Sequence, residues 1–181
     1  AKASGLLRYA GDMKLPNMLH MKLVLSPVAH GIVKAIDSSA ALAMPGVAAV
    51  LSFENTVDTK YNRGRVRISE DVMDQETLFS RHVRFVGDRV AAVLADSPEI
   101  AAAAAEAIQL EIEELPAVFT AKAAKREGAP QLHEDGNTVT LPECGFGGRY
   151  ADVQGEEFIH RSQTQRVSHI AMETHCAVAK F

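Results

Sequence analysis

The sequence has few cysteines, no long apolar run and no concentration of charge of one sign. Cys144 and Cys176 are its only cysteines, too few for a disulfide framework, so a reducing cytoplasm is the expected compartment. The longest apolar stretches have the length of strands, well short of the roughly 20 residues that cross a bilayer. Lysine and arginine total 19 against 23 acidic residues, and they are scattered along the chain. No membrane and no nucleic acid is therefore expected as a partner.

What the sequence does contain is a strand, a helix and a second strand with clear boundaries within Phe85–Pro116. The uninterrupted apolar run Val90–Ala95 predicts a strand that is covered on both faces, at the centre of a sheet. Ser97 provides a capping hydroxyl and Pro98 suits a first helical position, so a helix is expected to begin there. Alternation of apolar and acidic or amide residues in Ile108–Ile112 predicts the second strand. The turn before the helix lacks a glycine that would let a phosphate approach, so the unit is predicted to be framework.

Three more strands and a short helix are predicted upstream of this unit. The strands are expected at Met18–Ser26, Gly31–Asp37 and Val47–Phe53, and the helix at Ala40–Met44. The first strand alternates, with one apolar set on one face, as a half-buried strand does. That set is Leu19, Met21, Leu23 and Leu25, and the opposite set is His20, Lys22 and Val24.

The remaining segments are irregular. Glu54–Arg81 has no sustained period, and an excursion of this length tends to be functional, ordered by a partner or disordered. Helical turns are expected at Ala121–Arg126, and strand-like pieces at Glu157–Arg161 and Ala177–Phe181. Because the sequence stops within a strand-like piece, we expect a fragment of a longer polypeptide. The predicted class is α+β, a mixed, twisted sheet of about five strands with two main helices, followed by a linker and an incomplete second domain.

Several residues could be combined into sites, but their spacing favours structural roles. The glycine-rich stretch Cys144–Gly148 lacks the preceding strand and following helix of a dinucleotide loop, so a linker is favoured. Glu173 and His175 would share one face of an extended segment, where a packing contact is favoured over chemistry. The Arg63, Arg65 and Arg67 series predicts a solvated loop or one that docks on another subunit. Potential metal ligands without a zinc-site spacing are Cys144, His160, His169, His175 and Cys176. No residue is assigned as catalytic, cofactor-binding or metal-binding.

A series of short motifs runs in order along nearly the whole chain. They are Tyr9–Leu19, Ser26-Pro27 with Ala29-His30, Ile36-Asp37, Ala40-Ala41, Pro45-Gly46-Val47, VRFVGDRVAAV at Val83–Val93, EELP at Glu113–Pro116, HEDGN at His133–Asn137, Asp152-Val153, and His169 with METH at Met172–His175. Together they resemble the molybdenum-cofactor-binding chain of the xanthine dehydrogenase/aldehyde oxidase family, in its N-terminal α/β-hammerhead domain. Val28, Gly31 and Ala151 depart from the family pattern, and residues 137–157 fit it least well. The family's cofactor-side FGG motif lies downstream of METH, whereas the CGFGG stretch precedes it here.

The resemblance implies a molybdenum hydroxylase that oxidises a heterocycle or aldehyde with oxygen taken from water. A molybdopterin-bound molybdenum would be expected in the full protein, with iron–sulfur clusters and FAD on partner domains or subunits. The family's glutamate base and cofactor-contacting glutamine lie beyond the end of this sequence, so no functional residue is carried over and this piece alone is expected to be inactive.

The resemblance also suggests a division of the chain. Residues 1–136 would form the hammerhead domain, and residues 137–181 a linker and the truncated start of the molybdenum-cofactor-binding domain. The expected partners are the remainder of the molybdopterin-binding chain and the iron–sulfur and flavin subunits or domains. The alternative is a stand-alone, non-catalytic binding or scaffold module with the same fold.

Overall fold

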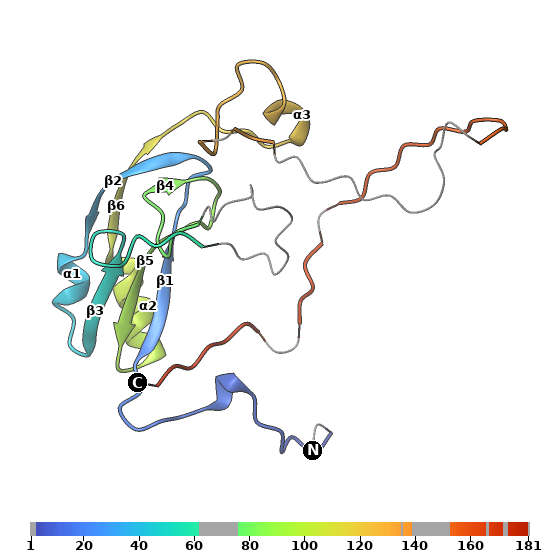
Figure 1. Cartoon of the computed structure of the whole chain (residues 1–181). Helices are drawn as coiled ribbons and strands as arrows, with labels where there is room; N and C mark the ends of the chain where they lie inside the picture. The colour runs from blue at the N-terminus through green and yellow to red at the C-terminus, as the bar shows by residue number, and fades with distance from the viewer. Residues whose placement is uncertain are drawn as a thin grey trace. The chain divides into compact units, whose positions relative to one another are not determined.

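The computed structural model describes residues 3–61, 76–134, 136–138, 153–165, 167–171 and 174–180 (Figure 1). The chain divides into two compact units, one formed by Asn17–Pro142 and the other by Ala1–Pro16 with Glu143–Phe181. The second of these contains only a short 3-10 turn among its described residues, η1 (Ala10–Asp12). The elements of the larger unit are β1 (His20–Leu25), β2 (Gly31–Asp37), α1 (Ser39–Leu42), β3 (Val47–Ser52), β4 (His82–Val83), β5 (Arg89–Ala95), α2 (Pro98–Ala107), β6 (Gln109–Glu114) and α3 (Ala121–Ala124).

The strands form two three-stranded sheets, with orders β1-β5-β3 and β4-β2-β6. Every pairing among these strands is antiparallel. The predicted α+β class is therefore confirmed, as is the central place of β5. The expected mixed sheet of about five strands is instead two antiparallel sheets, because the chain alternates between them: β1, β3 and β5 lie in one and β2, β4 and β6 in the other. The two-residue strand β4 has no hydrophobic pattern that could have predicted it.

The helix α2 begins where its local sequence predicts. The Ser97 hydroxyl accepts a hydrogen bond from the Ile100 amide at 3.2 Å, and Pro98 occupies the first turn, where no intrahelical partner for its nitrogen is needed. Ala101 and Ala104 are buried. Their small side chains let the helix lie close to the sheet, which explains the alanine run.

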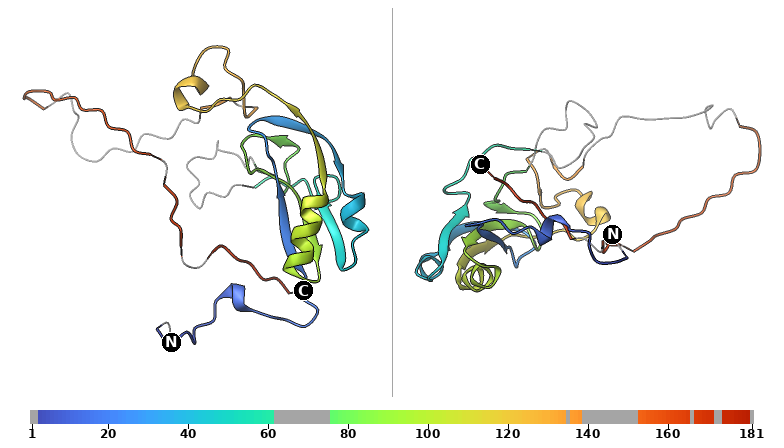
Figure 2. Two further views of the ribbon diagram at one scale, coloured as in Figure 1. Left: turned by 180° about the vertical axis from the view of Figure 1, so that it is seen from behind. Right: turned by 90° about the horizontal axis from the view of Figure 1, so that it is seen from below.

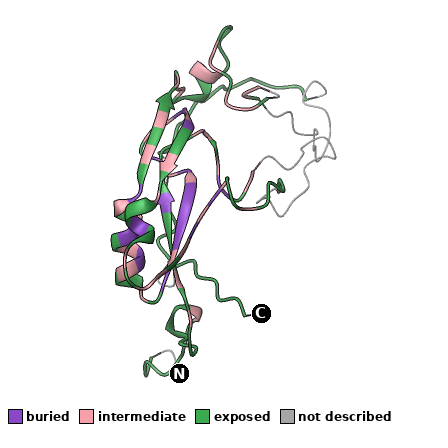
Figure 3. Cartoon of the chain, turned by 90° about the vertical axis from the view of Figure 1, so that its left-hand side faces the viewer, coloured by how far each residue is buried: buried purple, intermediate pink, exposed green. Residues whose placement is uncertain are grey.

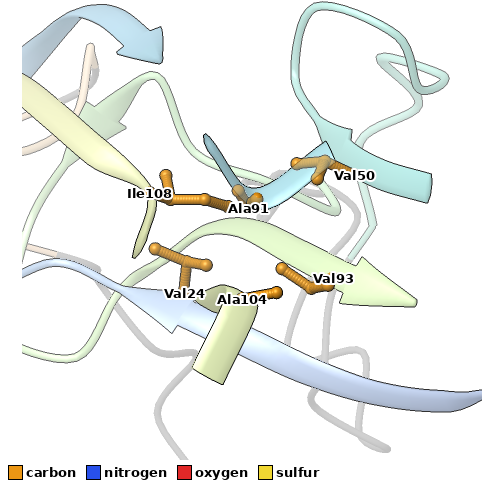
Figure 4. Packing of buried hydrophobic residues seen from close by; sticks show 7 residues of the cluster. Val24, Val50, Ala91, Val93, Ala104 and Ile108 are labelled. Carbon is orange, nitrogen blue, oxygen red and sulfur yellow. The ribbon is translucent and has the colours of Figure 1, made fainter. Parts of the chain in front are cut away.

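The main core lies between α2 and one face of the β1-β5-β3 sheet (Figure 4). Its members include Val24 from β1, Val93 from β5 and Ala104 from α2, with Ala41 of α1 beside them. Both α1 and α2 lie on the same side of the strands (Figure 2, right), and the buried residues gather where α2 meets the strands (Figure 3). A smaller cluster of Val33, Val83 and Val90 joins this layer to the second sheet.

The burial of β1 shows which of its two predicted faces lies against the helix. Val24 is only 8% exposed, whereas Leu19, Met21, Leu23 and Leu25 are 44%, 61%, 39% and 48% exposed. The larger apolar set therefore lies on the face away from α2. The reason is tertiary: the helix packs on the face of the sheet that carries Val24 of β1 with Ala91 and Val93 of β5.

Other expectations hold in part. The helix predicted at Ala40–Met44 is α1, and the Ser38 side chain makes no capping bond; instead the Asp37 carboxylate accepts from the Ser39 amide at 2.9 Å. The strand-like pieces at Glu157–Arg161 and Ala177–Phe181 form no strand in their described residues, which have no neighbouring strand to pair with there. Of the irregular excursion, residues 62–75 lie outside the described residues, and Tyr61 and Glu76 form an isolated bridge. No helix in the described part of the chain has the length and apolarity needed to span a membrane.

Candidate functional site

A concentrated set of polar contacts among the described residues lies around the turn between β4 and β5. The Asp88 side chain is 5% exposed, and its carboxylate accepts hydrogen bonds from the amides of Arg84 and Arg89 and from the Ser80 hydroxyl, at 3.1, 2.9 and 3.2 Å. Gly87 holds a positive φ of 93° and donates its amide to the Ser26 carbonyl at 2.8 Å. The sequence Gly87-Asp88-Arg89 thus forms a turn, and the Gly87 amide connects this turn to Ser26, the residue after β1.

A pair of histidines joins this turn region to the second sheet. His30, which precedes β2 and is 5% exposed, lies with its Nε2 atom 2.8 Å from the Nε2 atom of His82 in β4. The His30 Nδ1 atom lies 2.6 Å from the carbonyl oxygen of Pro116, just after β6. Because that carbonyl can only accept, His30 Nδ1 carries its hydrogen; in the neutral ring Nε2 is then the acceptor and His82 the donor. Both ring nitrogens of His30 therefore have hydrogen-bond partners. The ring connects the start of β2 with β4 and with the residues just after β6.

Electrostatics around His82 favour its neutral ring. Burial lowers the pKa of His82 below its ordinary value of 6.5, and the nearby Arg84, His30 and His133 lower this pKa further, while Asp88 opposes them. Arg84 also donates from Nε to the carbonyl of Leu132, which brings the HEDGN segment to this edge of the sheet.

The HEDGN segment is held by its asparagine. The Asn137 side-chain oxygen accepts from the Leu132 amide at 2.8 Å, and its nitrogen donates to the carbonyls of Ala124 and Pro130 at 3.1 and 2.8 Å. One side chain thus satisfies three backbone groups, one at the end of α3 and two in the segment that follows it. This accounts for the motif as a structural element.

Those of the residues singled out from the sequence that the structure describes are not assembled into a site. His160, His169, His175 and Cys176 are all exposed, and Cys176 is a free thiol. Glu173, the Cys144–Gly148 stretch and the Arg63, Arg65 and Arg67 series lie outside the described residues. Among the residues that the structure describes, no three histidine, cysteine, aspartate or glutamate side chains are grouped so as to hold a metal ion.

The histidine pair and the Asp88 turn were not found by sequence reasoning. His30 and His82 are 52 residues apart and share no local pattern. Only the family motifs around Ser26–His30 and Val83–Val93 marked these segments, without indicating that they meet. The histidine pair and the Asp88 turn hold backbone segments together. The nitrogens of the His30 ring and the oxygens of the Asp88 carboxylate form hydrogen bonds with protein groups and do not line a pocket.

Two small antiparallel sheets, with one alanine-rich helix packed on the first, define an α/β domain of the hammerhead type. The family model described as "Aldehyde oxidase and xanthine dehydrogenase, a/b hammerhead domain" matches residues 4–116. The chain belongs to this family.

Relatives agree with that assignment over most of the chain. The xanthine dehydrogenase molybdenum-binding subunit of Escherichia coli O157:H7 is 31% identical over 99% of this chain and 25% of its own length. The carbon monoxide dehydrogenase large chain of Hydrogenophaga pseudoflava is 43% identical over 70% of this chain and 15% of its own. The chain therefore spans a quarter or less of the length of these two relatives.

Solved structures show the same fold. Quinoline 2-oxidoreductase from Pseudomonas putida 86 superimposes with a TM-score of 0.68 at 36% identity, covering 77% of this chain and 18% of that one. The aldehyde oxidoreductase from Desulfovibrio gigas gives a TM-score of 0.66 at 33% identity, covering 74% of this chain and 15% of that one.

Proposed function

We propose that this chain is a non-catalytic structural domain of a molybdenum hydroxylase, an oxidoreductase that acts on a heterocycle or an aldehyde with oxygen from water. The observation that carries the proposal is the alignment along 99% of the chain with 25% of a xanthine dehydrogenase molybdenum-binding subunit. Relatives that share the fold are named for aldehyde and quinoline oxidation, which supports the substrate class.

The molybdenum cofactor would be held by the rest of the parent chain. The described residues offer no set of ligands for a metal, and the polar groups around His30 and Asp88 are occupied by protein partners. Relatives are named as molybdenum-binding subunits and large chains, which supports partner subunits that carry iron–sulfur clusters and a flavin. A cytoplasmic location is proposed because Cys176 is a free, exposed thiol.

We divide the chain into a hammerhead domain, residues 1–136, and a linker with the start of a molybdenum-cofactor-binding domain, residues 137–181. The family model ends at residue 116, within the first part. In the second part the described residues expose large apolar side chains that a further domain would cover: Phe158, Ile159, Val167 and Ile170.

The test begins with the coding sequence beyond Phe181 and continues with the full-length protein. We expect several hundred further residues, and molybdenum in the purified protein by elemental analysis together with extractable molybdopterin. The 181-residue chain, purified in parallel, gives the background for both measurements. A stop codon directly after Phe181 would instead support the stand-alone module, and a full-length protein without molybdenum would overturn the proposal.

A further inference from the structure

One face of the β1-β5-β3 sheet is apolar and lies opposite the helices. Antiparallel pairing places residues of the three strands side by side on this face in two rows. The rows are Met21, Leu94 and Ala49, and Leu23, Ala92 and Leu51. Neither row contains a polar side chain. We call this surface, with Leu19 and Leu25 at the ends of its β1 edge, the Met21 face.

The Met21 face ends at a polar boundary. Arg89, the β5 residue that pairs with Leu25, binds the Glu76 carboxylate at 3.1 Å and lies over the Tyr61 ring, 5.8 Å from its centre. The charged groups are therefore gathered beyond the last row. Apolar rows with a polar rim are typical of a surface that is covered in the assembled protein.

The other face of the same sheet is already covered by α2. An antiparallel sheet with one face in solvent normally alternates apolar and polar residues, whereas a sheet that is apolar on both faces has a layer on each. Within the described residues of Asn17–Pro142 no second layer covers β1, where Met21 is 61% exposed although its neighbour in the next strand, Leu94, is half-buried. The strand β1 thus directs its larger apolar set, which includes Met21 and Leu23, away from the helix, as a strand that is covered on that face would.

We propose that the Met21 face is the docking surface for the part of the parent polypeptide that follows residue 181. This inference rests on the proposed function, which supplies a parent chain. The relative that aligns with 99% of this chain has three quarters of its length outside the alignment, enough to provide a packed layer. A segment of the same polypeptide also meets the face at the high effective concentration that tethering gives, which a separate partner lacks.

The experiment compares two adjacent residues of β1 that point to opposite faces. Met21→Cys and Lys22→Cys are made separately in the full-length protein and in the 181-residue chain. Alkylation of each thiol is followed by mass spectrometry of the peptide that contains it, so that other cysteines do not interfere. In the full-length protein we expect Met21→Cys to react at least ~10-fold more slowly than Lys22→Cys, because a docked layer must open before the reagent enters. In the 181-residue chain the two thiols should react at similar rates.

Other outcomes overturn the proposal. Equal rates in the full-length protein would mean that the Met21 face is free. Slow reaction of Met21→Cys in the dilute 181-residue chain would mean that residues of this chain cover the face, and slowing only at high concentration would identify a second copy. Molybdenum content, measured on the same full-length sample, separates the two ideas. Molybdenum with a freely reactive Met21→Cys removes this inference alone, and a protected thiol without molybdenum removes the proposed function alone.

Discussion

The Nε2 atoms of His30 and His82 lie 2.8 Å apart, with the two rings stacked at a centroid distance of 5.0 Å. Only one hydrogen can lie between these atoms. With the His30 Nδ1 hydrogen directed to the Pro116 carbonyl, an additional proton on His30 Nε2 would set two N–H groups against each other. The contact joins the start of β2, the strand β4 and the end of β6, so it couples protonation to the integrity of the second sheet.

Stability is therefore expected to fall as the pH falls below about 6.5. The folded protein lowers the pKa of His82, chiefly by burial, so the unfolded chain binds a proton first as the pH decreases. The free energy of unfolding then decreases from the unfolded value near 6.5 down to the lower folded value, below which this contribution is constant. Urea unfolding at a series of pH values between about 7.5 and 5 measures the slope.

The variant His82→Gln isolates this contribution. A glutamine amide can still donate to His30 Nε2 but does not titrate, so the slope should become shallower. His160→Gln, which removes a histidine from the exposed chain of the other unit, is the control. An unchanged slope in His82→Gln would show that other groups cause the pH dependence.

Gly46 is expected to tolerate alanine poorly for two separable reasons. Its φ is +87°, and a Cβ atom there would lie 2.9 Å from Cδ1 of Ile100 in α2. Gly128 has a φ of +72° and open space around the position of its Cβ. Gly128→Ala should cost about 1 kcal/mol from the backbone alone, and Gly46→Ala roughly 2 kcal/mol or more, measured by chemical denaturation.

Shortening Ile100 tests the contact part of the Gly46 effect. Ile100→Val removes the Cδ1 atom, so Gly46→Ala should cost less in that background than in the wild type. If Gly46→Ala and Gly128→Ala were equally destabilising, the close approach of Gly46, just before β3, to Ile100 of α2 would contribute nothing to the loss of stability.

The elements with local signals could be predicted from the sequence, and the contacts between distant elements could not. Ser97 and Pro98 set the start of α2 by bonds within one turn, and the apolar run of β5 implied its central place. The alternation in β1 defined its two faces but did not say which one the helix covers. The larger apolar set is the one that contains Met21 and Leu23, yet the helix packs on the face that contains Val24.

The histidine pair shows a second limit of local patterns. His30 and His82 come together only because β2 pairs with β4, a strand of two residues that has no period to recognise. Family motifs marked both segments as characteristic, but a motif does not state which of its residues touch. The candidate site was therefore visible only once the pairing of the strands was known.

Asn137 is predicted to hold the segment after α3 by its three hydrogen bonds. Asn137→Ala removes all of them and should increase amide exchange in residues 120–134 by at least ~10-fold, since each bond contributes about 1 kcal/mol. Asn137→Asp keeps an acceptor for Leu132 but loses both donors, so an intermediate increase is expected. Asn55→Ala is the matched control, because Asn55 makes similar bonds to Ser52 and Val50 around β3. Equal exchange in all variants would contradict this role.

The orientation of β1 gives the sharpest contrast between two positions of one strand. Val24 belongs to the core beneath α2, so Val24→Lys places a charge in that core and should cost roughly 3 kcal/mol or more. Met21 lies on the opposite face and is 61% exposed, so Met21→Lys should change the free energy of unfolding of the 181-residue chain by no more than about 0.5 kcal/mol.

The two variants introduce the same side chain three residues apart, which matches them for strand propensity and charge. Urea unfolding of both measures the difference. A large loss in Met21→Lys together with a small loss in Val24→Lys would mean that the face with Met21, and not the face with Val24, is buried in the 181-residue chain. In the full-length protein, by contrast, Met21→Lys should be as harmful as a core substitution, because the charge would then lie beneath the layer that covers the Met21 face.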